Sequence, residues 1–181
     1  MKLNKLTNRI YFLGHDPEAD RPILAYLKGD KFSLAIDAGY SASLKDQKEQ
    51  SRDTGYIKVL KKEDVHFRKE YCGQDKLNIV LSDIAFSDKM TLDLGGLTAR
   101  IFHTVSPHSE DTVCVYVPEE GVLFLGDSTS EDFFNDGYMD KNKLHSLIQT
   151  IQSVDCEYCI LSHCEPLGKE ELLAYLYSLE A

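Results

Sequence analysis

Short apolar runs separated by turn residues dominate this chain and predict a protein rich in β-strands. In the first forty residues the runs 6–13, 23–28 and 32–36 are rich in branched and aromatic side chains, and the turn residues 14–17 and 29–30 separate them. Gly29-Asp30 between two such runs predicts a tight hairpin. Further strands are expected at 77–81, 90–94, 98–105, 113–117, 122–125 and 158–161.

Two segments near the C-terminus have the spacing of amphipathic helices instead. The first should begin after Asp140, whose side chain can cap a helix, and the second should begin at about Lys169. The apolar residues expected to face the core are Leu144, Leu147, Ile148, Ile151 and Val154 in the first, and Leu172, Leu173, Leu176 and Leu179 in the second. Many strands with few, late helices predict packed sheets covered by helices rather than a doubly wound parallel sheet.

The middle of the chain has a different character. Residues 45–52 have no apolar face at either the helical or the strand period, which predicts an exposed helix or a loose loop. Residues 60–71 are also heavily charged. We expect the 181 residues to form one domain spanning 1–181.

The net charge and the cysteine content limit the expected binding partners and the expected cellular compartment. A formal net charge of -10 argues against nucleic acid or an anionic membrane as a partner, because both need a positive surface. Five cysteines are an odd number for a disulfide framework, so reduced thiols and a cytoplasmic location are expected. Cys156-x-x-Cys159 has redox or zinc-binding spacing, but no second pair accompanies it.

Three residues of metal-binding type follow apolar runs and are candidates for a shared site. They are His108, Asp127 and His163, and loops at strand ends are where a sheet can aim side chains at one point. Asp127 has two interpretations: an acid that needs a cation, or a residue that caps the following turn. His108 and His163, taken singly, are also consistent with ordinary hydrogen-bonded loop residues. His15, His66 and His145 are assigned to the surface.

The order and local sequence of these motifs resemble the metallo-β-lactamase superfamily. The resemblance rests on Ala35 to Gly39 after a hairpin, Ser106-Pro107-His108-Ser109, Leu123 to Asp127, and Leu161-Ser162-His163. It implies an α+β fold, a four-layer αββα sandwich with a one- or two-metal site at one edge. It also implies that His108 binds a first metal, that Asp127 bridges two metals and takes part in catalysis, and that His163 binds the second. Asp37 would lie behind the site.

One signature of that family is missing from this chain. Its His-x-His-x-Asp-His cluster should follow the Asp37 to Gly39 region, yet only His66 lies between residues 40 and 100. The chain therefore reads as though part of the N-terminal half were absent. The remaining residues would give each metal ion two protein ligands, fewer than the three of a catalytic zinc site. Zinc is the metal that the resemblance implies, with Fe or Mn as alternatives. We expect its occupancy to be weak or absent.

Two function classes remain open at this stage. One is a zinc-dependent hydrolase of an ester, lactam or phosphodiester, present here in shortened form. The other is an inactive binding or scaffold protein on a degenerate hydrolase fold. A di-iron redox role is more distant, because iron needs the same missing ligands. Loss of a helix and a strand would expose sheet edges, so homodimerisation is a further hypothesis.

Overall fold

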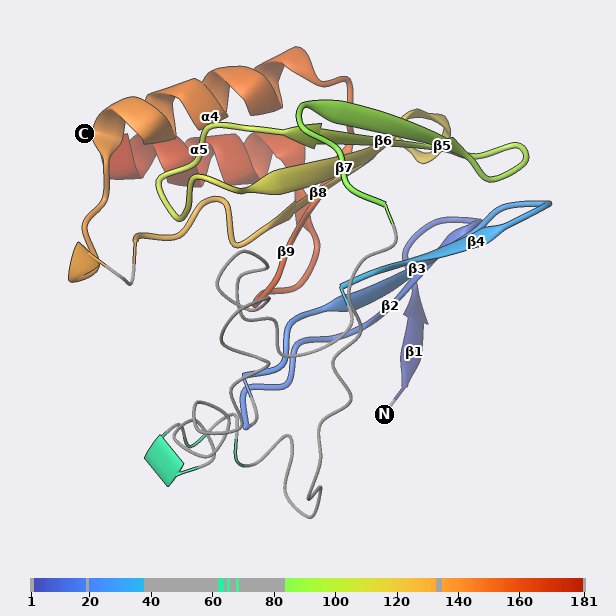
Figure 1. Cartoon of the computed structure of the whole chain (residues 1–181), viewed down its shortest axis with the longest axis horizontal. Helices are drawn as coiled ribbons and strands as arrows, with labels where there is room; N and C mark the ends of the chain where they lie inside the picture. Colours follow the sequence, from blue (N-terminus) through green and yellow to red (C-terminus); the bar gives the residue numbers. More distant parts are fainter. Residues whose placement is uncertain are drawn as a thin grey trace.

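The structure is a computed structural model, and it describes residues 2–18, 20–37, 62, 63, 65, 68, 84–132 and 135–180. Within these residues the chain forms two β-sheets and two long α-helices (Figure 1). The sequence predictions for residues 45–52, 60–71 and 77–81 fall mainly or wholly outside the described residues. No helix in the described ranges is both long and apolar enough to cross a lipid bilayer.

The first sheet is an antiparallel meander of four strands. Its strands are β1 (Leu3–Lys5), β2 (Ile10–Leu13), β3 (Leu24–Lys28) and β4 (Ser33–Ile36), in that spatial order. The strand predicted for residues 6–13 is shorter, Ile10–Leu13, and β1 before it was not predicted. The Thr7 hydroxyl oxygen accepts hydrogen bonds from the backbone N–H groups of Arg9 and Ile10. That local bond turns the chain and separates β1 from β2.

The second sheet has six strands. They are β5 (Lys89–Asp93), β6 (Thr98–His103), β7 (Val113–Val117), β8 (Val122–Gly126), β9 (Tyr158–Leu161) and β10 (Leu167–Gly168), in the order β10-β9-β8-β7-β6-β5. The turn η1 (Pro118–Glu120) joins β7 to β8. All neighbours are antiparallel except β8 and β9, whose parallel pairing brings their C-terminal ends to one edge.

Two apolar layers hold these elements together. The alternating inward faces of both sheets make the first, with Ile10, Leu27, Leu97 and Val122 fully or almost fully buried. The helices α4 (Lys141–Ser153) and α5 (Lys169–Glu180) make the second against the opposite face of the six-stranded sheet (Figure 1). The described layers are therefore sheet, sheet and helix. The predicted fourth, helical layer falls on residues outside the described ranges.

The helix predictions are confirmed at residue level. The Asp140 carboxylate accepts hydrogen bonds from the N–H groups of Asn142 (2.9 Å) and Lys143 (3.1 Å), so it caps α4 as its sequence position indicates. The expected stripe of α4 is buried apart from Val154, which is half-buried. Leu172, Leu173 and Leu176 of α5 are buried as well.

A backbone junction joins the two sheets at the end far from β9. The N–H groups of Lys31 and Phe32 donate to the carbonyl oxygen of Leu94, at 2.9 and 3.0 Å, and that of Asp30 donates to Gly95 at 2.7 Å. The β3–β4 hairpin therefore lies on the β5–β6 turn with no room between their backbones. A Cβ atom at Gly29 would lie 2.1 Å from the Leu94 oxygen.

Gly29→Ala should consequently destabilise the protein by roughly 1–3 kcal/mol, because the junction must open to admit the methyl group. Gly168→Ala is the matched control, since nothing lies within 4 Å of a Cβ atom there. Urea unfolding of both variants measures the difference. Equal stabilities would show that the hairpin and the turn can separate at no cost.

Candidate metal centre

Asp127 lies where the most apolar strand ends. Gly126 adopts a positive φ of 58° at a register shift in the β8–β9 pairing, and this sharp bend directs the next residue out of the sheet. The turn that follows is closed by backbone bonds, from Ser130 N–H to the Asp127 carbonyl at 2.9 Å among them. The Asp127 carboxylate instead contacts His163, with 3.3 Å between Oδ1 and Nε2.

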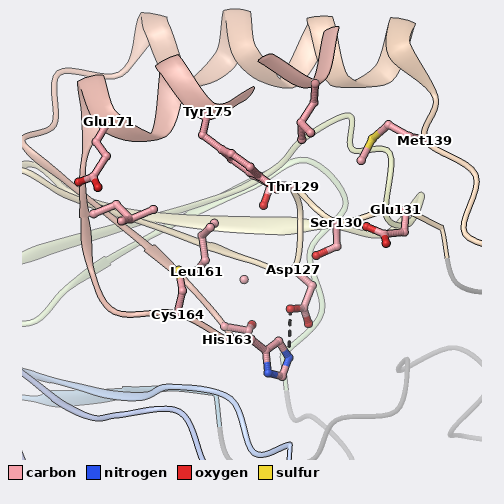
Figure 2. A pocket seen from close by; sticks show the side chains of 14 residues that line it. Asp127, Thr129, Ser130, Glu131, Met139, Leu161, His163, Cys164, Glu171 and Tyr175 are labelled. Carbon is pink, nitrogen blue, oxygen red and sulfur yellow. Dashed lines mark ion pairs between the residues drawn. The ribbon is translucent and has the colours of Figure 1, made fainter. Parts of the chain in front are cut away.

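His163 is the point where several residues meet. It lies two residues after the end of β9, and the parallel pairing of β8 and β9 places it beside Asp127. Its other ring nitrogen, Nδ1, lies 3.3 Å from Oδ1 of Asp20. The imidazole therefore stands between two carboxylates, both about one-third to one-half exposed. Figure 2 shows the contact between the His163 ring and Asp127 at the border of a pocket.

His108 is held close to this region but is not part of the same cluster. Its N–H donates to the Ser106 hydroxyl, and Ser106 in turn donates to the carbonyl of Ser128 at 2.8 Å. Its Nδ1 lies 2.9 Å from the carbonyl oxygen of Glu131. Potential ligand atoms of His108 do not join those of Asp127 and His163 in a group within 4.8 Å in the described part of the chain. The three-residue ligand set stays a prediction.

The residues that do form such a group include two that the sequence did not single out. His15, Asp20 and His163 each offer a ligand atom, and these atoms lie within 4.8 Å of one another. The rings of His15 and His163 meet edge to face with centroids 5.1 Å apart. His15 was assigned to the surface, but it is half-buried and its Nε2 atom is inaccessible to solvent. His15 is therefore at the surface only in part, because the His163 ring packs against it.

The loop between β2 and β3 brings His15 and Asp20 to this position. Asp16 and Arg21 exchange two backbone hydrogen bonds across the loop, at 3.0 and 3.1 Å. The buried Arg21 guanidinium donates to the carbonyls of Gly14 and Pro22, which fixes both ends of the loop. The N–H of Ile23 donates to the carbonyl of Ser162 at 2.7 Å and attaches the loop to the residue before His163.

A pocket of about 650 Å³ opens beside Asp127 and His163, between the strand ends and α5 (Figure 2). Its acidic lining residues are Asp127, Glu131 and Glu171, and no lysine or arginine occurs among the described residues that line it. The other side chains mix apolar and small polar groups, including Thr129, Ser130, Met139, Leu161, Cys164, Leu167, Tyr175 and Leu179.

Comparisons with known proteins locate the fold. No family model matches the sequence, and no curated protein matches it. Solved structures do: a metallo-β-lactamase from Pontibacter korlensis has a TM-score of 0.60 at 16% identity, with 99% of this chain and 98% of that chain covered. An archaeal metallo-β-lactamase superfamily protein from Sulfolobus tokodaii also has a TM-score of 0.60, at 18% identity, with 97% and 88% covered. The chain has the metallo-β-lactamase fold.

The FIM-1 metallo-β-lactamase from Pseudomonas aeruginosa, in a mono-zinc form, is similar too, with a TM-score of 0.52, 20% identity, and 98% and 95% coverage. The resemblance and the α+β sandwich inferred from the sequence are thus confirmed at the level of the fold. Within the metallo-β-lactamase fold, Asp127 and His163 lie at one sheet edge. Asp37 follows β4 with a positive φ of 61°, and its role behind the site stays a prediction.

The four described cysteines are free thiols, and they differ in access. Burial raises the pKa of Cys114 to about 12. Burial, followed by the nearby Glu165 and Glu171 carboxylates, also raises the pKa of Cys164, but this thiol is half-buried and lines the pocket. A hydrogen bond with Cys159, 3.9 Å away between the sulfur atoms, lowers the pKa of the buried Cys156 and raises that of Cys159.

Iodoacetamide at pH 8 should therefore modify Cys164 in the folded protein and leave Cys114 unmodified. A pKa of about 12 leaves roughly one thiolate in ten thousand at that pH, and the side chain is also inaccessible. Mass spectrometry of tryptic peptides measures the two rates, and unfolding in guanidinium is the control that should make them similar. Fast native labelling of Cys114 would contradict the packing of the second core.

Proposed function

We propose that this single-domain chain is a metal-dependent hydrolase that acts on a small molecule, with zinc as the metal. The observation that carries the proposal is the contact between Asp127 and His163 at the ends of two adjacent parallel strands, beside a pocket of substrate size. The metallo-β-lactamase fold supports it. The cytoplasmic location that the odd number of cysteines suggests is part of this proposal.

The donor set fits zinc. Imidazole nitrogens and carboxylate oxygens are its usual ligands besides thiolates, and His163 and Asp127 supply one of each. A bound zinc ion supplies a nucleophilic water at neutral pH and polarises the scissile carbonyl. His163 would hold the ion, and Asp127 would orient that water or accept its proton. The Glu131 carbonyl fixes the His108 ring, which keeps His108 a candidate ligand.

The charge of the pocket restricts the class of substrate. Its described lining includes three carboxylates and His163 but no lysine or arginine, so an anionic substrate would be repelled by these carboxylates. A neutral ester or lactam with an apolar portion fits the lining better than a phosphodiester. Leu161, Leu167 and Tyr175 provide the apolar contact area.

A non-catalytic scaffold on the same fold is the second candidate. The missing His-x-His-x-Asp-His cluster favours it, since only six histidines occur in the whole chain and none forms that motif. A di-iron or manganese protein would require the same ligands. Homodimerisation of the chain stays a prediction, to be tested by sedimentation.

Zinc loading followed by activity measurement separates the two candidates. A hydrolase should take up about one zinc ion per chain and cleave generic neutral esters or lactams. Asp127→Ala should lower kcat/KM by roughly 100-fold or more, because it removes the acid–base group. Asp155→Asn is the matched control, an exposed aspartate near the start of β9, the end opposite His163. No hydrolysis with zinc bound would favour the scaffold, and equal activity in the parent and Asp127→Ala would reject Asp127 as the acid–base group.

A further inference from the structure

We propose that His15, Asp20 and His163 form the metal site of this chain, in place of the cluster that its sequence lacks. The proposal rests on the proposed function for its catalytic meaning, but the metal site itself is argued from side-chain positions alone. Two imidazoles and one carboxylate offer ligand atoms within 4.8 Å of one another, and three protein ligands are the number that a catalytic zinc uses.

The contact distances suit a shared ion. Nδ1 of His163 and Oδ1 of Asp20 are 3.3 Å apart, longer than the about 2.7–2.9 Å of a charge-assisted hydrogen bond. Two atoms that each bind a tetrahedral zinc at ~2.0–2.1 Å lie roughly 3.3–3.4 Å apart. The distance between His163 and Asp20 is therefore compatible with two ligands of one ion, although Asp127 lies at the same distance from the other ring nitrogen of His163.

His15 supplies the second, independent observation. Its Nε2 atom is inaccessible to solvent and has no hydrogen-bond partner among the described residues. Burial of an unpaired ring nitrogen costs about 1–3 kcal/mol, so such atoms usually have a function. A protonated His163 between two carboxylates would account for Asp20 and Asp127, but it would leave this atom of His15 unexplained. A metal ion accounts for all three residues of the group.

Asp127 acquires a different role in this arrangement. A neutral imidazole has one lone pair, so a metal at Nδ1 of His163 requires the proton on Nε2, which faces Asp127 at 3.3 Å. Asp127 is then a positioning residue that holds the ring and its tautomer, as carboxylates commonly do for metal-bound histidines. A metal at Nε2 with Asp127 and His108, as the family resemblance implies, requires the opposite tautomer. A neutral His163 ring can therefore bind a metal ion at Nδ1 or at Nε2, but not at both.

The loop that carries His15 and Asp20 is suited to this task. Arg21 is buried, and its guanidinium donates to the carbonyls of Gly14 and Pro22. Among the described residues, the Asp20 carboxylate contacts His163. The bond from Ile23 to Ser162 fixes the loop beside β9, so the three donors do not depend on a flexible approach.

Zinc affinity of four variants tests the assignment, with competition against a chromophoric chelator as the measurement. His15→Ala and Asp20→Asn should each weaken Zn²⁺ binding by roughly 100-fold or more, since each removes a ligand and the effect should exceed that of losing a second-sphere partner. His145→Ala, at an exposed histidine outside the site, is the control and should bind as the parent does. His108→Ala separates this assignment from the ligand set that the family resemblance implies. The Asp20 side chain is 52% exposed, so Asp20→Asn is expected to fold, and thermal unfolding of the zinc-free variants checks this.

The ¹⁵N NMR spectrum of His163 distinguishes a metal ligand from a residue that has only a structural role. Zinc should shift the Nδ1 resonance to that of a metal-bound nitrogen and leave the proton on Nε2. Binding at Nε2, or loss of zinc in His108→Ala with binding retained in His15→Ala and Asp20→Asn, would overturn the assignment while leaving the proposed hydrolase intact. Zinc bound through His15 and Asp20 with no hydrolysis would reject the hydrolase and keep the site. Failure of the parent chain to bind zinc would overturn the assignment.

Discussion

The attachment of the β2–β3 loop to the end of β9 is the constraint on which the candidate site depends. One backbone hydrogen bond, from Ile23 to Ser162, joins the two sheets next to His163. At the opposite end, the β3–β4 hairpin is bonded to the β5–β6 turn. These hydrogen bonds fix the two sheets to each other at both ends, so that residues of the β2–β3 loop lie beside His163. Backbone donors and acceptors that would otherwise be buried unpaired give each junction its specificity.

The candidate site combines two residues that follow strands of the six-stranded sheet with two residues of the β2–β3 loop. Asp127 and His163 follow adjacent parallel strands of a buried sheet, so their separation is fixed by the strand pairing. His15 and Asp20 come from a loop that Arg21 braces through two carbonyl oxygens. A metal ion bound between the halves would add a further bond between the sheets. Metal binding would then also raise the stability of the folded state, because the unfolded chain has no such preformed site.

The tautomer of His163 decides which chemistry this arrangement supports. Each ring nitrogen faces a carboxylate at the same distance, so distance alone does not choose between them. His15 and Asp20 come from the same loop, and Asp20 faces Nδ1, so the proposed ion would bind at Nδ1. In that case a chain without the His-x-His-x-Asp-His cluster would have a three-ligand site on the same fold, displaced to the other side of one imidazole. The acidic pocket beside it remains available to a neutral substrate.

The sequence alone predicted most of the secondary structure and two residues of the candidate site, Asp127 and His163. The alternation of apolar residues gave most strands, Asp140 marked the start of α4, and the acid and imidazole that follow β8 and β9 were identified as partners. These features are local, or depend on strand ends that a parallel pair must bring together. Sequence could not reveal that the turn containing His15 and Asp20 contacts His163, since nothing in a turn's composition specifies which distant strand end it meets. Tertiary structure decided that, through packing of two sheets whose junctions are made by backbone atoms common to every residue.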